Sequence, residues 1–238
     1  MYDEELNDTP VATSAFWIAR YPVTVAQFLA FVAATGQQIG DKDALRDPDS
    51  RPVRRLSWHE ALAYCRWLML QLQRAPALAG SPAARLIRDA GWQVSLPSEL
   101  EWEIAARGGL QAQAFSWSDV PDAERANCDS SGIDNTCAVG CFAANGFGLH
   151  DMLGNVWEWT RSLWSPPGDD NKVLGYPYHP DDAQRENPDA GDSVRRVVRG
   201  GSWLGAADGA SCAFRGRGWP DDRSDLLGFR VVLRSPPV

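Results

Sequence analysis

The spacing of apolar positions divides the chain into a helical first part and a second part of short strands and loops. Before residue 110, three capping boxes mark helix starts, each a Ser or Thr followed three residues later by Glu or Gln. The boxes begin at Thr24, Ser57 and Ser98, and apolar residues recur after each with the period of a helix. The pattern predicts three helices, and it leaves residues 72–84 as a loop or a short extra helix.

The second part of the chain has a different pattern. Short runs such as "NVWEWT", "RVVRGGSW" and "GFRVVLR" are separated by Gly, Asn, Asp and Pro, which is typical of short strands joined by ordered loops. Residues 165–194 are polar and proline-rich, and we expect them to form an exposed loop excursion. Because neither part alone can close a core, the pattern predicts one α+β domain over residues 1–238.

Charge and hydropathy narrow the possible partners. The 238 residues are 44% hydrophobic and carry a net charge of −8, so the chain can bury a core but does not suit a nucleic-acid surface. No apolar run reaches the roughly 18 residues of a membrane span, and the acidic N-terminus does not follow the pattern of a secretory signal. We therefore expect no nucleic-acid partner and no membrane span, with a monomer and a cytoplasmic location as the default expectations.

Five cysteines are too few and too irregularly spaced for a disulfide scaffold. None forms a Cys-x-x-Cys pair, so a structural zinc site is not expected. Cys128, Cys137 and Cys141 fall in one predicted loop region, where either a disulfide or free thiols would be compatible with the spacing.

Several segments, in this order, resemble one family: "YPVTVAQFLAFV", "LPSELEWEIAARGG", "NGFGLHDMLGNVWEWT", "VVRGGSW" and "GFRVV". They are similar to the formylglycine-generating-enzyme, or sulfatase-modifying-factor, domain. The resemblance spans about residues 16–233 and implies a variant of the C-type lectin fold, loop-rich with short strands and two to three helices. Family domains usually have a strand before the "YPVT" helix, and only about fifteen residues precede Phe16 here. The chain is thus expected to be the C-terminal part of a longer protein.

Enzymatic chemistry of this family is disfavoured by the residues present. Catalytic members are understood to use two cysteines after Gly-Gly-Ser that hold copper(I), an ion that thiolates suit. Here residues 204–211 contain no cysteine, and Cys212 falls at a position that is not catalytic in the family. Related sulfoxide synthases use histidines for iron, whereas His59, His150 and His179 are far apart and lack ligand spacing. An oxidoreductase of either type is kept as an alternative, as is a fixed accessory domain of a larger effector.

A second resemblance concerns the segment of residues 199–233. Variable proteins of diversity-generating retroelements often use this fold, and a reverse transcriptase rewrites their last segment at template adenines. Between "RGGSW" and "GFRVV" this chain keeps the residues that such templates leave unchanged: Ala213, Arg215, Arg217, Pro220, Asp221, Arg223, Gly228, Phe229 and Arg230. The resemblance implies a non-enzymatic protein that binds a protein or cell-surface ligand. The predicted ligand-binding positions are Leu204, Gly205, Ala206, Asp208, Gly209, Phe214, Gly216, Gly218, Trp219, Asp222, Ser224, Asp225 and Leu226.

The alternation of arginines with these positions predicts how the segment is built. We expect Arg215, Arg217 and Arg223 to point inward or along the frame and pair with carboxylates, so that the interleaved side chains face outward. The anchors for a ligand would be Phe214, Trp219, Leu204 and Leu226. The alternative is that Phe214 and Trp219 belong to the core. Trp219 also departs from the template pattern, because adenine substitution in an asparagine codon does not yield tryptophan.

Carboxylates in "GLHDMLGNVWEWT" predict a structural calcium site. Buried carboxylates need a cation or strong hydrogen bonds, and Ca²⁺ takes carboxylates together with backbone carbonyls. The family resemblance places ligands at Asp151, Gly154, Val156 and Glu158. The alternative is that arginines satisfy Glu158 and no metal is bound. A second family site would use Asn127, Cys128 and Asp134.

Overall fold

The computed structural model describes residues 3–4, 13–109, 114–176 and 184–236, and it contains two sheets. The larger has the strand order β1-β6-β5-β4-β7, in which β4 runs antiparallel to β5 and parallel to β7. The smaller is antiparallel with the order β2-β8-β3. The strands are β1 (Asp3–Glu4), β2 (Phe16–Ile18), β3 (Gln93–Ser95), β4 (Trp157–Leu163), β5 (Arg196–Arg199), β6 (Phe214–Gly218), β7 (Leu227–Gly228) and β8 (Val232–Arg234).

The described residues of the first part of the chain form four α-helices: α1 (Val25–Thr35), α2 (Trp58–Arg74), α3 (Pro82–Ala90) and α4 (Glu99–Arg107). All three predicted capping boxes are formed, with both reciprocal hydrogen bonds present at each. The additional helix is α3, which begins within the region of residues 72–84 that was predicted as a loop or a short helix. Ser81 caps it by accepting the backbone N–H of Ala84, and Pro82 supplies a first-turn residue that lacks an orphan N–H.

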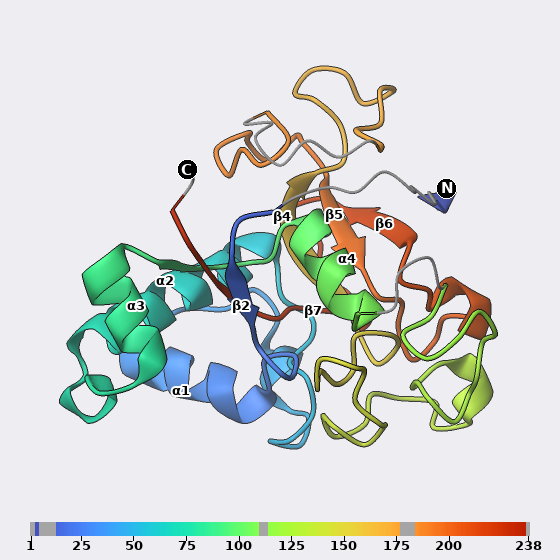
Figure 1. Ribbon diagram of the computed structural model, residues 1–238, viewed down its shortest axis with the longest axis horizontal. Helices are drawn as coiled ribbons and strands as arrows, with labels where there is room; N and C mark the ends of the chain where they lie inside the picture. Colours follow the sequence, from blue (N-terminus) through green and yellow to red (C-terminus); the bar gives the residue numbers. More distant parts are fainter. Residues whose placement is uncertain (1–2, 5–12, 110–113, 177–183, 237–238) are drawn as a thin grey trace.

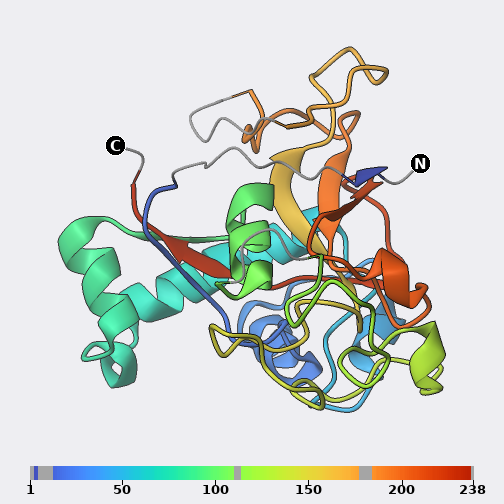
Figure 2. The same ribbon diagram turned by 45° about the vertical axis from the view of Figure 1, so that its right-hand side comes forward.

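The helices cover the sheets on two sides. Helices α1, α2 and α3 gather on the left in Figure 1, and α4 lies against β4 and β5. One core forms around Phe28, Phe31, Tyr64, Trp159 and Phe229, all at most 4% exposed. A second core around Trp102 joins α4 to the loops after residue 114. The turned view in Figure 2 shows the gold and orange strands β4 and β5 beside the green helix α4. The predicted α+β architecture is thus confirmed, with four helices where two to three were expected.

The segment of residues 165–194 is only partly the exposed excursion that the sequence predicts. Most of its described residues are exposed, but Arg185 is buried and its guanidinium lies 3.0 Å from the carboxylate of Glu99 on α4. The segment therefore contributes a buried charge to the core. Its residues 177–183, which include His179, lie outside the described part of the chain. Among the described helices, none has the length and apolarity needed to cross a membrane.

Candidate ligand-binding surface

Strand β6 sorts its side chains onto the two faces of the large sheet, because successive residues of a strand point to opposite sides. Arg215 points toward α4, where its guanidinium binds Glu99, and Arg217 stacks over the Trp164 ring at 5.0 Å. Phe214 points the other way and stacks on Trp157 of β4, with ring centroids 5.8 Å apart. Along β6, Arg215 and Phe214 thus lie on opposite faces of the sheet, as the predicted alternation requires; that the face of Phe214 binds a ligand stays a prediction.

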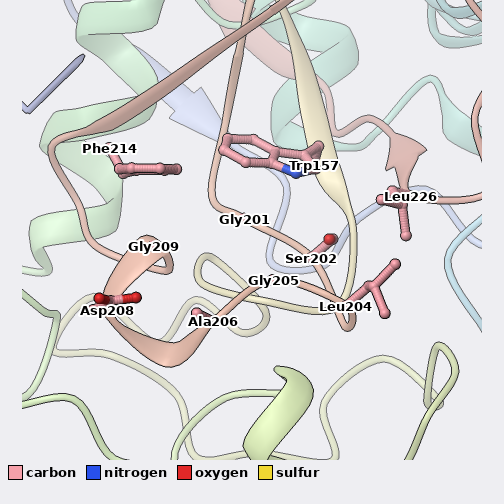
Figure 3. Close-up of a pocket in the computed structure, with 10 residues that line it drawn as sticks. All are labelled: Trp157, Gly201, Ser202, Leu204, Gly205, Ala206, Asp208, Gly209, Phe214 and Leu226. Atoms are coloured by element: carbon pink, nitrogen blue, oxygen red, sulfur yellow. The ribbon is translucent and has the colours of Figure 1, made fainter. Parts of the chain in front are cut away.

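The face opposite α4 carries a pocket of about 440 Å³ between β4, β6 and the loop after Gly201. We call it the Trp157 pocket. Figure 3 shows Trp157 and Phe214 on one side, with the loop that carries Leu204, Ala206 and Asp208 facing them. Leu204 is 59% exposed. The lining residues are Trp157, Gly201, Ser202, Leu204, Gly205, Ala206, Asp208, Gly209, Phe214 and Leu226.

A second pocket of about 280 Å³ adjoins the first and shares Trp157 and Leu226 with it. Its walls combine β5 and β6 with the loop before β7. The lining residues are Trp157, Val198, Gly216, Arg217, Gly218, Asp222, Arg223, Ser224, Leu226 and Leu227. The two pockets form one concave surface centred on Trp157 and Leu226.

The predicted ligand-binding residues concentrate on this surface. Seven of them line the Trp157 pocket, and Gly216, Gly218, Asp222 and Ser224 line the second pocket. Trp219 and Asp225 line neither. Trp219 is 39% exposed, and the Arg195 guanidinium lies over its ring at 5.1 Å.

Trp157, at the centre of the surface, was not among the predicted residues. It belongs to "NVWEWT", which is far in sequence from residues 199–233. That motif predicted only a strand and calcium ligands. Its neighbour Trp159, two residues along β4, is fully buried. An unequal environment for two tryptophans on the same strand face is visible only in the tertiary structure.

Two predicted positions leave no room for a side chain. A Cβ atom built at Gly216 would lie 2.9 Å from Val198 Cγ2 and 3.2 Å from the Trp157 ring. A Cβ atom at Gly218 would lie 2.6 Å from the ring of Trp159, which is rigidly enclosed because protein cores are close-packed. These glycines contribute backbone to the second pocket, and their environment disfavours them as exchangeable positions.

A buried ion-pair network joins β5 and β6 to α4, on the side of the sheet away from the Trp157 pocket. Glu99 of α4 is fully buried and binds Arg215 and Arg185, with Arg199 3.7 Å away. Burial by itself would raise the pKa of Glu99, but the three guanidinium groups outweigh it and lower the pKa to about 2. Glu99 is therefore ionised, and its charge-assisted hydrogen bonds to Arg215 and Arg185 fix β6 and the segment around residue 185 against α4.

Glu103, one turn further along α4, extends this network. It binds Arg199 of β5, Arg107 on its own helix, and the Tyr176 hydroxyl. A separate ion pair joins residues 199–233 to α2: the Arg223 guanidinium lies 3.2 Å from the Glu60 carboxylate. The prediction that arginines of the variable segment pair with carboxylates is confirmed for Arg215 and Arg223.

The carboxylate of the first predicted calcium site is already neutralised within the protein. Arg230 donates to both oxygens of Glu158, at 2.7 and 2.8 Å, and the Trp102 indole N–H donates at 2.7 Å. The Asp151 carboxylate accepts the Gly140 N–H at 2.7 Å. An ion at this ligand set would have to displace Arg230, so Glu158 does not fit calcium in this geometry. The described residues also hold no group of three or more His, Cys, Asp or Glu placed to share a metal.

The second predicted calcium set is likewise occupied by a donor of the protein. Ser131 donates its hydroxyl to the Asn127 side chain at 3.1 Å and to the Cys128 carbonyl at 2.7 Å. Asp134 is exposed and adopts a left-handed backbone conformation with φ of 55°. Calcium binding at either set stays a prediction.

Among the residues that the structure describes, the thiols and imidazoles are not assembled into a reactive centre. All five cysteines are free. Cys212 is fully buried, and burial raises the pKa of its thiol to about 12, so it stays protonated and unreactive. His59 pairs with Asp192 at 2.8 Å, and His150 stacks on Tyr21 while bonding the Phe142 carbonyl.

Comparisons with known proteins place this geometry in a family. The model of the sulfatase-modifying factor enzyme 1-like domain matches residues 2–235. The mouse protein named inactive C-alpha-formylglycine-generating enzyme 2 is 31% identical over 212 residues, covering 82% of this chain and 53% of that protein. Mouse formylglycine-generating enzyme is 29% identical over 216 residues, covering 84% and 48%. The chain thus spans about half the length of these two relatives.

A solved structure extends the comparison to a variable protein. Treponema denticola variable protein 1 superposes with a TM-score of 0.65 and 26% identity, covering 92% of this chain and 84% of that one. The predicted resemblance to both groups, and the predicted C-type lectin fold of the formylglycine-generating-enzyme type, are confirmed. The chain belongs to the family of sulfatase-modifying factor enzyme 1-like domains.

Proposed function

We propose that this chain is a non-enzymatic ligand-binding protein, whose segment of residues 199–233 is diversified by a retroelement to recognise a protein or cell-surface molecule. The observation that carries the proposal is the gathering of predicted positions on one surface. Eleven of the thirteen positions chosen from the sequence line two adjoining pockets. The likeness to a variable protein of Treponema denticola supports the same interpretation.

The physical design suits a surface whose side chains are exchanged. Arg215 and Arg199 are fully buried and tie β5 and β6 to Glu99 and Glu103 of α4. A frame held in this way keeps its shape when exposed residues such as Leu204 and Asp208 are replaced. Because the frame is ordered before the ligand arrives, little conformational entropy is lost on binding.

The absence of paired thiols supports a non-enzymatic role. In the described segment after Gly201 the one cysteine is Cys212, a buried thiol with a raised pKa. An oxidoreductase of the family remains the alternative, and two measurements separate it from a binding protein. Copper(I) titration of the purified chain should show no stoichiometric binding, and a cysteine-containing peptide should not be oxidised. Stoichiometric copper(I) binding with turnover of the peptide would contradict the proposal of a non-enzymatic binding protein.

The diversified origin of the segment is tested by the DNA sequence around the gene. We expect a near-copy of the codons for residues 199–233 beside a reverse-transcriptase gene, differing from them only at template adenines. The differing codons should fall at exposed positions of the two pockets, such as Leu204, Ala206 and Asp208. If no such copy exists, the segment belongs to a fixed accessory domain, which is the third candidate.

A further inference from the structure

We propose that the Trp157 pocket receives an aromatic or branched aliphatic side chain of a protein partner, and that this side chain is flanked in the partner by lysine or arginine. This inference rests on the proposed function, because it assigns the chemistry of the ligand to the surface described above. It follows from the composition of the pocket wall, the charge at its rim and the space beside Phe214.

The wall of the pocket is apolar. Trp157 and Phe214 stack at an interplanar angle of 30°, and Leu204 and Leu226 complete the lining on the other side (Figure 3). A volume of about 440 Å³ falls within the range of pockets that enclose small ligands or side chains. Leu204 exposes 59% of its surface at the mouth, so an incoming apolar group would remove apolar surface of both partners from water.

The rim of the pocket is anionic. Asp208 is the one charged residue that lines it. Asp129 is exposed, and its backbone N–H donates to the Gly205 carbonyl at 3.0 Å, which places it beside the same loop. Within the described part of the chain, neither carboxylate takes part in a salt bridge. Asp225, which precedes the lining residue Leu226, already has Arg55 at 3.6 Å. Two carboxylates beside an apolar pocket complement basic groups beside an apolar side chain.

Gly209 sets the depth of the pocket. A Cβ atom at this position would lie 3.5 Å from the Phe214 ring, an ordinary contact that requires no rearrangement. A larger side chain at position 209 would extend over the ring and fill the space that the ligand needs. Gly209 is therefore a specificity-determining position, and its replacement blocks the pocket without breaking the buried frame.

The test uses three defined peptides and nuclear magnetic resonance of the full chain. The probes are N-acetylated, C-amidated Lys-Trp-Lys, Glu-Trp-Glu and Lys-Ala-Lys. We expect Lys-Trp-Lys to shift the Trp157 indole N–H and the amides of Gly205 and Gly209. Glu-Trp-Glu should bind about fivefold more weakly at low ionic strength, as expected for exposed ion pairs, and Lys-Ala-Lys should cause no shift at these groups.

Matched variants locate the binding. Gly209→Leu should abolish the shifts, whereas Gly80→Leu, at an exposed glycine with open space around it, should leave them unchanged. If Gly209→Leu does not fold, Ala206→Trp blocks the same pocket from an exposed position. Asp208→Asn should weaken Lys-Trp-Lys binding about twofold to fivefold, and Asp89→Asn on α3 is its control.

The outcomes separate this inference from the proposed function. If Lys-Ala-Lys binds the Trp157 pocket as well as Lys-Trp-Lys does, or if Glu-Trp-Glu binds it more tightly, the inference is wrong. The proposed binding surface would still stand. Binding of Lys-Trp-Lys at a different surface, such as the polar pocket around Gln37 and His59, overturns both. Absence of any shift also overturns the inference, while the proposed function is then decided by the DNA sequence around the gene.

Discussion

Replacement of Glu99 by glutamine is the most direct test of the buried frame behind the ligand-binding surface. The change keeps the shape of the side chain and removes its charge. Glu99 is fully buried and lies within 3.0 Å of both Arg215 and Arg185, with Arg199 at 3.7 Å. The variant therefore leaves three arginines without their shared counter-charge.

The expected loss in the free energy of unfolding follows from the pKa of Glu99. A pKa lowered from 4.5 to about 2 corresponds to about 3 kcal/mol of stabilisation of the ionised form, at about 1.4 kcal/mol for each pKa unit. Removal of one partner from a buried ion pair typically costs about 3–5 kcal/mol. Both routes predict that Glu99→Gln loses about 3 kcal/mol, a large part of the roughly 5–15 kcal/mol that stabilises a domain.

The assay is urea unfolding followed by tryptophan fluorescence, with Glu124→Gln as the control because Glu124 is exposed. The control should change the free energy of unfolding by less than about 0.5 kcal/mol. A loss below about 1 kcal/mol for Glu99→Gln would refute the reasoning, because it would mean that the arginines find other partners or water at no cost.

The pH dependence of the same comparison gives an independent test. The folded-state pKa of Glu99 lies below its ordinary value, so its contribution is fully present above about pH 4.5 and is lost as the pH falls toward about 2. The difference in unfolding free energy between the parent chain and Glu99→Gln should shrink over this window. A difference that stays constant down to about pH 3 would show that the ionised carboxylate is not its source.

Three further predictions concern other parts of the structure. Gly218→Ala should destabilise the chain by about 1–3 kcal/mol through overpacking against Trp159, whereas Gly80→Ala should not, and urea unfolding compares them. Iodoacetamide should label the exposed Cys141 before Cys212, which is buried with a pKa of about 12; peptide mass mapping measures the order, and equal rates would contradict it. The Tm should be the same in excess calcium chloride and in excess EGTA, because Arg230 already neutralises Glu158; a rise in calcium would support the predicted ligand set.

Local features of this protein could be predicted from the sequence because their causes are local. The capping boxes at Thr24, Ser57 and Ser98 each join residues three positions apart, and all three form as predicted. The alternation of Arg215 and Arg217 with Phe214 also follows from the two-residue period of a strand. The sequence does not decide whether α3 forms, because Ala, Gly and Pro around residues 75–84 suit a loop or a helix end equally well.

Only the tertiary structure decided which groups meet across the chain. The sequence offers Glu158 either calcium or an arginine, and β7 with the residues after it brings Arg230 against it from 72 positions away. Trp157 became the centre of the ligand-binding surface because β6 and the loop after Gly201 fold over it. Gly216 and Gly218 looked exchangeable in the sequence, yet β4 places tryptophan rings where their side chains would lie. The sequence by itself determined the three capped helices, the family and the segment in which the predicted binding positions lie. The partners of its buried charges and the space beside its glycines depend on packing between distant segments, which no local pattern encodes.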